Sequence, residues 1–142
     1  MSMFKIISES AIANKIKSNK NINVIEGCTD KEINEAERSL NMKFPNEYKT
    51  ILKEFGCIDF GACEWTGLNI KGHLNVVTAT LKEKSVNKDF PEKHFVLEDF
   101  NIDAKKAIVN ERGNVFIISR SNIKPAAGSI SQFLEKRLKE SM

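Results

Sequence analysis

Residues 29–56 read TDKEINEAERSLNMKFPNEYKTILKEFG, and this stretch predicts two amphipathic helices joined by a short turn. Thr29 and Glu32 have the spacing of a capping box, in which each side chain accepts a hydrogen bond from a backbone amide at a helix start. Ile33 and Leu40 follow two turns apart. One side of the first helix is therefore expected to face a core.

The second helix is expected to start at Pro45, because a first helical turn does not use the amide hydrogen that proline lacks. Tyr48 and Leu52 lie one turn apart on one side of this helix. Asn41 is expected to end the first helix in the left-handed conformation, and Gly56 to end the second.

After these helices the hydrophobic pattern changes to that of strands and turns. Residues 74–81 are rich in β-branched side chains and are expected to form a strand, with a helix as the alternative. Residues 107–118 predict a hairpin that turns at Gly113, and Ser129 is positioned to cap a closing helix. Helices at both ends of a hairpin-rich middle predict an α+β fold, with a largely antiparallel sheet flanked by helices.

The size and composition of the chain favour a single domain over residues 1–142. The chain is 41% hydrophobic and 29% charged, which is ordinary for a globular protein. Its longest apolar run, Val115–Ile118, is far shorter than the roughly 18 residues of a membrane span. The first residues lack the apolar region of a secretory signal, so we expect a cytoplasmic protein without membrane contact.

The cysteines and histidines do not form a recognisable metal or cofactor motif. Five residues separate Cys57 from Cys63, and neither His73 nor His94 completes a ligand pattern, so neither a metal nor another cofactor is predicted. A thiol-dependent enzyme that uses one of these histidines as a base is an alternative. We expect instead reduced thiols buried as small apolar groups, and no catalytic residues.

Trp65 and the acidic pair Glu98–Asp99 are further candidate functional residues. The neighbours Glu98 and Asp99 are predicted to be surface charges, since adjacent strand residues point to opposite faces and would not share an acid–base site. Trp65 is expected either to lie in the core or to be an exposed interface anchor beside Glu64.

Charge is unevenly distributed along the chain. The net charge is +3, but residues 26–65 carry five basic and nine acidic side chains, whereas residues 66–142 carry thirteen basic and nine acidic ones. The acidic part predicts either a recognition face for a basic partner or an ordinary solvated helix face. Nucleic-acid binding is not expected, although it is a possible role for one lysine-rich stretch, which contains Lys82, Lys84, Lys88 and Lys93.

The helix pair resembles the signature of the SUKH superfamily. This superfamily includes the yeast cell-wall regulator of the Smi1/Knr4 type and many bacterial toxin-immunity proteins. The residues that match its spacing are Thr29, Ile33, Glu37, Leu40, Phe44, Pro45, Tyr48, Leu52 and Gly56. Phe44 stands where Leu is usual, and Asn41 where Gly is frequent. The resemblance extends over most of residues 22–138, with residues 76–78 as a strand.

The resemblance implies a noncatalytic bacterial immunity protein that neutralises a cognate protein toxin by covering its active domain. The toxin-binding residues are predicted to include Asp59, Glu64 and Trp65, a choice made from local charge and the aromatic ring. A regulatory protein-interaction module without a toxin partner is the alternative. Glu37 is expected to accept hydrogen bonds from backbone amides near Pro45.

Overall fold

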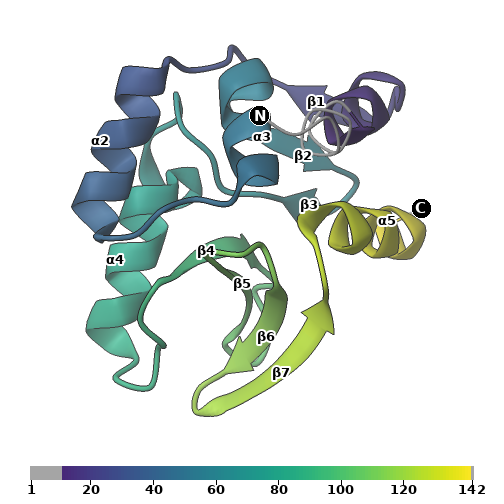
Figure 1. The fold of residues 1–142 in the computed structure, drawn as a ribbon. Helices are drawn as coiled ribbons and strands as arrows, with labels where there is room; N and C mark the ends of the chain where they lie inside the picture. The colour runs from purple at the N-terminus through teal and green to yellow at the C-terminus, as the bar shows by residue number, and fades with distance from the viewer. Residues whose placement is uncertain (1–10, 142) are drawn as a thin grey trace.

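The computed structural model describes residues 11–141 and has the predicted α+β fold (Figure 1). Residues 11–17 are helical. The elements that follow are β1 (Ile22–Val24), α2 (Asp30–Leu40), α3 (Asn46–Phe55), β2 (Ile58–Phe60), β3 (Cys63–Glu64), a 3-10 turn (Gly72–Leu74), α4 (Val76–Val86), β4 (His94–Asp99), β5 (Lys105–Asn110), β6 (Val115–Ser119), β7 (Asn122–Ala127) and α5 (Ile130–Ser141).

The predicted helix pair is confirmed. The Thr29 hydroxyl accepts from the Glu32 amide at 3.2 Å, and the Glu32 carboxylate accepts from the Thr29 amide at 2.9 Å, which completes the capping box of α2. Asn41 ends α2 in the left-handed conformation with φ 52°. Pro45 is the N-cap of α3, with extended backbone, so the prediction that it lies inside the first turn was one residue too early.

Gly56 ends α3, with φ 70°, and a second glycine packs directly against it. A Cβ atom on Gly67 would lie 2.0 Å from the Gly56 carbonyl oxygen, which no side chain allows. The Leu68 amide donates to this same oxygen at 2.9 Å. The two glycines thus let the loop after β3 lie against the end of α3.

The strands form two antiparallel sheets. One contains β1, β2 and β3 in that order, and the other contains β4, β5, β6 and β7. Gly113, with φ +90°, turns the chain between β5 and β6, as predicted. The α5 cap is also confirmed, because the Ser129 hydroxyl accepts from the Gln132 amide at 3.1 Å.

The strand predicted over residues 74–81, and over residues 76–78 from the family resemblance, is wrong, and the helix alternative is confirmed for residues 76–81, which belong to α4. Leu74 ends the 3-10 turn, and Asn75 precedes α4. Asn75 caps the helix by accepting from the amides of Val77 and Thr78. The residues of α4 that are buried are Val76, Thr80 and Glu83, which have helical spacing. Two of these three are polar, so hydrophobic periodicity did not identify the buried side of the helix.

The four-stranded sheet is packed on both faces. One face contributes residues such as Phe95 and Val109 to the main core, which also contains buried side chains of α2, α3 and α5. The other face packs Val96 and Ile108 with Ala79 of α4. Figure 1 shows α4 and α5 on opposite sides of this curled sheet.

Candidate protein-binding surface

The β2–β3 hairpin places two of the predicted partner-binding residues opposite each other. In this antiparallel pair Asp59 faces Glu64, whereas Phe60 faces Cys63. Ile58, Phe60 and Cys63 are buried, so the alternation of strand side chains directs both carboxylates to the outer face of the small sheet.

A row of polar side chains crosses this outer face. Asn23 of β1 lies beside Asp59, and its Nδ2 atom donates to Asp59 Oδ1 at 2.7 Å. Glu64 is exposed at the other end of the row. Within residues 11–141, neither Asp59 nor Glu64 takes part in an ion pair. Like charges directly opposite on paired strands lower stability, so folding alone does not account for this acidic row.

Glu64 also lines a cavity of about 200 Å³ between α4 and the start of the four-stranded sheet. Glu83 and Asp99 line the same cavity, and Lys106 pairs with them at 3.3 and 3.7 Å. These two carboxylates thus share one cationic partner. Glu64 and the neighbouring Asp59 have no such partner within residues 11–141 and present their charge to a basic partner.

Trp65 lies in the core and is fully buried, which confirms the first of its two predicted positions. Its predicted place on the binding surface is wrong. Its indole Nε1 donates to the Glu98 carboxylate at 3.0 Å. Its ring contacts Phe60 and Phe133, with centroid distances of 5.5 and 6.1 Å. Trp65 therefore joins the hairpin to the four-stranded sheet and to α5.

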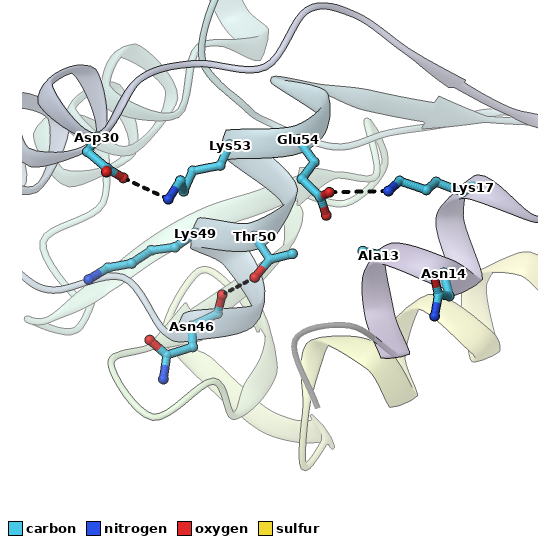
Figure 2. Close-up of a pocket in the computed structure, with 9 residues that line it drawn as sticks. All are labelled: Ala13, Asn14, Lys17, Asp30, Asn46, Lys49, Thr50, Lys53 and Glu54. Carbon is cyan, nitrogen blue, oxygen red and sulfur yellow. Dashed lines mark hydrogen bonds and ion pairs between the residues drawn. The ribbon is translucent and has the colours of Figure 1, made fainter. Parts of the chain in front are cut away.

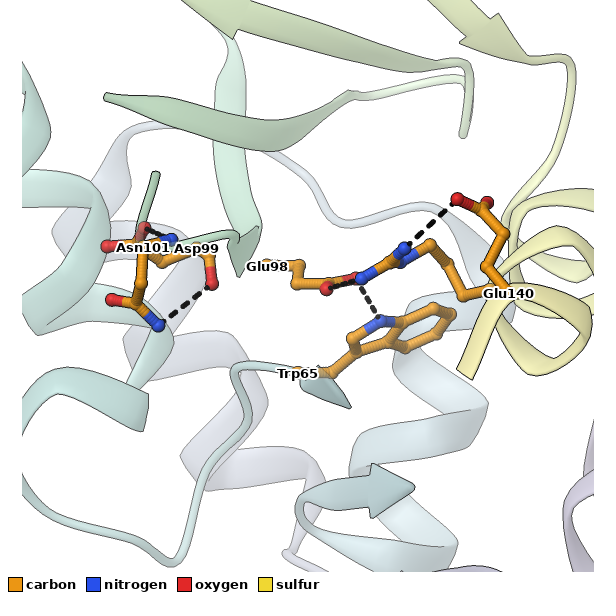
Figure 3. Close-up of polar contacts among 6 residues, drawn as sticks. Trp65, Glu98, Asp99, Asn101 and Glu140 are labelled. Atoms are coloured by element: carbon orange, nitrogen blue, oxygen red, sulfur yellow. Dashed lines mark hydrogen bonds and ion pairs between the residues drawn. The ribbon is translucent and has the colours of Figure 1, made fainter. Parts of the chain in front are cut away.

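Glu98 is likewise buried, with 2% of its surface exposed, and its prediction as a surface charge is wrong. Arg137 of α5 donates to its two carboxylate oxygens, from Nε at 3.0 Å and from Nη2 at 2.5 Å. Figure 3 shows Trp65 and Glu140 approaching this cluster from different parts of the fold. Asp99, the next residue, is exposed as predicted.

The family-motif residues serve the fold. The Phe44 amide donates to Glu37 Oε2 at 2.6 Å, which confirms the predicted role of Glu37 beside Pro45. Lys49 lies 3.6 Å from the same carboxylate oxygen. The ring of Tyr48 is buried. The apolar residues of the motif are buried as well, namely Ile33, Leu40, Phe44 and Leu52.

All three cysteines are free thiols and are buried. Two of them donate hydrogen bonds to backbone carbonyl oxygens. Cys57 Sγ donates to the Trp65 carbonyl oxygen at 3.1 Å, and Cys28 Sγ to the Leu52 carbonyl oxygen at 3.1 Å. Burial raises the pKa of the Cys57 thiol to about 11. His94 contacts the Glu92 carbonyl oxygen at 2.7 Å rather than a thiol.

A wider groove of about 570 Å³ lies between residues 11–17 and α3 (Figure 2). Four of its charged groups are paired with one another: Lys53 lies 3.1 Å from Asp30, and Lys17 lies 3.3 Å from Glu54. The fifth, Lys49, lies 3.6 Å from Glu37, which is outside the groove. This groove therefore offers a partner little unbalanced charge.

Over residues 11–141, no three His, Cys, Asp or Glu side chains lie close enough together to hold a metal ion. In that same part of the chain, no helix combines the length and the apolar character that crossing a membrane requires.

Comparison with known proteins identifies a matching protein family. The family model described as SMI1-KNR4 cell-wall, one of the SUKH models, matches residues 6–139, nearly the whole chain. No curated protein matches the sequence.

Proposed function

This chain belongs to the SMI1-KNR4 (SUKH) family, and on that premise we propose that it is a noncatalytic immunity protein for a bacterial toxin. It binds the cognate toxin and covers its active domain, so that the substrate of the toxin is kept out. The bound surface includes the acidic row of Asn23, Asp59 and Glu64.

The observation that carries this proposal is the pair of opposed carboxylates on the outer face of the small sheet. Asp59 and Glu64 face each other without an ion pair from residues 11–141, at some expense of stability. Binding of a basic protein face would relieve this repulsion. It would also speed association, because opposite surface charges steer two proteins together.

The chemistry of the thiols supports a binding role over a catalytic one. A thiol nucleophile must lose its proton, and burial raises the pKa of Cys57 and Cys63 to about 11. At neutral pH both therefore remain protonated. The nearest hydrogen-bond acceptor of Cys57 is a backbone carbonyl, which does not act as a general base.

The test starts from the partner that affinity capture from source cells recovers in stoichiometric amount. Co-expression with the chain should restore growth to cells that this partner alone arrests, and the purified chain should inhibit it at equal molarity. The double variant Asp59→Asn/Glu64→Gln should lower the association rate about tenfold at low salt.

A control variant with the same charge change is Glu35→Gln/Glu92→Gln, which alters two exposed residues elsewhere on the surface. It should leave the association rate within about twofold of wild type. A partner that is not toxic, or a toxic one whose growth arrest the chain does not relieve, contradicts the proposal.

The second candidate is a regulatory interaction module, and the description of the matching family as SMI1-KNR4 cell-wall favours it. In that case affinity capture recovers several housekeeping proteins, and deletion of the gene alters cell-wall integrity without any toxin being present.

A further inference from the structure

A second groove, opposite in charge to the acidic row, lies between the four-stranded sheet and α5. It has a volume of about 340 Å³. Its apolar surface comes from Phe100, Ile117 and Phe133, and Ile102 extends this surface with 61% of its own area exposed. An apolar side chain of a partner that covered this surface would remove it from water, which is favourable.

The charged groups around this groove are mostly cationic. Lys105 of β5 and Lys136 and Arg137 of α5 line it, together with the carboxylate of Glu140. The charge of Arg137 is balanced by buried Glu98, so the excess positive charge comes from the two lysines. Lys136 Nζ is held against the groove wall by the Ala126 carbonyl oxygen at 2.8 Å. Lys105 is exposed and takes part in none of the ion pairs within residues 11–141.

Arg137 is fixed in place before any partner arrives. Buried Glu98 accepts from its Nε and Nη2 atoms, and the guanidinium lies 4.7 Å from the centre of the Phe100 ring. Within residues 11–141, the contact that the remaining Nη1 atom makes is a long one of 3.5 Å with exposed Glu140 (Figure 3). A partner carboxylate can replace Glu140 there without any loss of side-chain freedom by Arg137.

We propose that this basic groove, defined by Phe100, Ile102, Lys105, Lys136 and Arg137, binds an acidic segment of a partner protein that carries a large apolar side chain. The apolar side chain lies on Phe100 and Ile102, and the carboxylates contact Arg137 and the two lysines. This surface goes beyond the function proposed above, because it is separate from the acidic row and takes a partner of opposite charge.

An acidic protein segment fits the groove better than a nucleic acid does. Lys105, Lys136 and the Nη1 atom of Arg137 surround one apolar hollow, which matches a short run of carboxylates with one apolar anchor. A nucleic-acid strand needs a longer basic track, and the lysine-rich stretch that includes Lys82 and Lys88 lines none of this groove.

The experiment uses the full chain and two synthetic peptides that differ only in charge. The first is acetyl-Glu-Asp-Glu-Leu-Phe-Glu-Asp-Glu-amide, and the second has Lys at every acidic position. In amide NMR titrations the acidic peptide should shift the signals of residues 100–105, Ile117 and residues 133–137, whereas the basic peptide should not.

Lys105→Glu/Lys136→Glu should weaken binding of the acidic peptide at least about tenfold. Ile102→Asp, which leaves the lysines in place, should weaken it as well. The matched control is Lys31→Glu/Lys88→Glu, which makes the same change in net charge at exposed residues outside the groove. It should change the affinity by less than about twofold.

Three results overturn the proposal: shifts outside the groove, equal weakening by the control variant, or tighter binding of a single-stranded oligonucleotide than of the acidic peptide. No toxin enters this experiment. A negative result therefore removes the basic groove as a docking site and leaves the immunity function to its own test.

Discussion

Two buried carboxylates, Glu37 and Glu98, hold separate parts of the molecule together at the scale of single residues. Glu37 closes the turn between α2 and α3 through the Phe44 amide. Glu98 joins Trp65 and Arg137, which are far apart in the sequence. Each is satisfied by hydrogen bonds as well as by charge, which is the condition for burying a carboxylate.

Glu37→Gln is expected to lower the free energy of unfolding by about 1–2 kcal/mol, because a charge-assisted hydrogen bond to a buried amide becomes a neutral one. The Lys49 contact is weakened at the same time. Urea denaturation measures the change. The control Glu35→Gln alters an exposed residue of the same helix and should stay within about 0.5 kcal/mol of wild type. Equal midpoints for the two variants would argue against a role for Glu37.

The three cysteines are expected to resist alkylation in the folded protein. Burial raises the pKa of the Cys28, Cys57 and Cys63 thiols to about 11, so only about one in a thousand is ionised at pH 8. The labelling rate by iodoacetamide should rise about tenfold per pH unit up to that pKa. Mass spectrometry after native and denatured labelling measures it. Fast native labelling of Cys57 at pH 7 would instead favour the thiol-enzyme alternative.

The raised thiol pKa values also set the direction of a pH effect on stability. The folded state favours the protonated thiols, so their contribution is complete below the pKa of about 9 for an unfolded thiol. It is lost as the pH rises toward about 11, the value for folded Cys57. The free energy of unfolding should therefore fall over this alkaline range, and less steeply in a Cys57→Ala variant.

At the scale of elements, the sequence predicted correctly the caps and turns that depend on contacts between residues close together in the chain. The capping box of α2, the left-handed Asn41 and the turn at Gly113 each depend on residues within a few positions of one another. The positions of Trp65 and Glu98 could not be predicted in this way. Their partners lie 33 and 39 residues away along the chain, and no local pattern records such pairs.

Helix α4 was not the favoured prediction because two of its three buried residues are polar. Thr80 is fully buried but is polar, so it adds nothing to the apolar periodicity of the sequence. Its hydroxyl accepts a hydrogen bond from the Val96 amide of β4 at 3.0 Å. Glu83 is buried through its pair with Lys106. The β-branched composition favoured a strand, and the tertiary contacts of α4 outweigh that preference. Asn75 was the one local indication of a helix start.

Asn75→Ala is expected to destabilise the protein by about 1 kcal/mol, since Asn75 accepts from two amides at the start of α4. Asn75→Ser keeps a capping oxygen and should recover most of the loss. Thermal unfolding followed by far-UV circular dichroism compares the three proteins. If Ser and Ala give the same melting temperature, the cap contributes nothing and the Asn75 side chain acts only through its bond to the Ile70 carbonyl.

At the scale of the whole molecule, the uneven charge of the sequence becomes two separate surfaces. The acidic row belongs to the part of the chain that carries more acidic than basic residues, and the basic groove to the part with the opposite excess. Charges counted along the sequence allowed an acidic recognition face as one of two alternatives, the other being an ordinary solvated helix face. The sequence did not predict the groove, since Lys105 and Arg137 line one groove only after α5 has folded back beside the four-stranded sheet.

The two sheets and α5 are expected to unfold as one cooperative unit. Trp65 is the only tryptophan, and it contacts Phe60 of the small sheet, Glu98 of the large sheet and Phe133 of α5. Because these parts share one buried residue, we expect them to unfold together. Tryptophan fluorescence and far-UV circular dichroism should give coincident guanidinium transitions. Phe133→Leu should shift both transitions equally, by about 1–2 kcal/mol. Fluorescence that changes at a lower denaturant concentration than the dichroism would show that α5 separates from the sheets first.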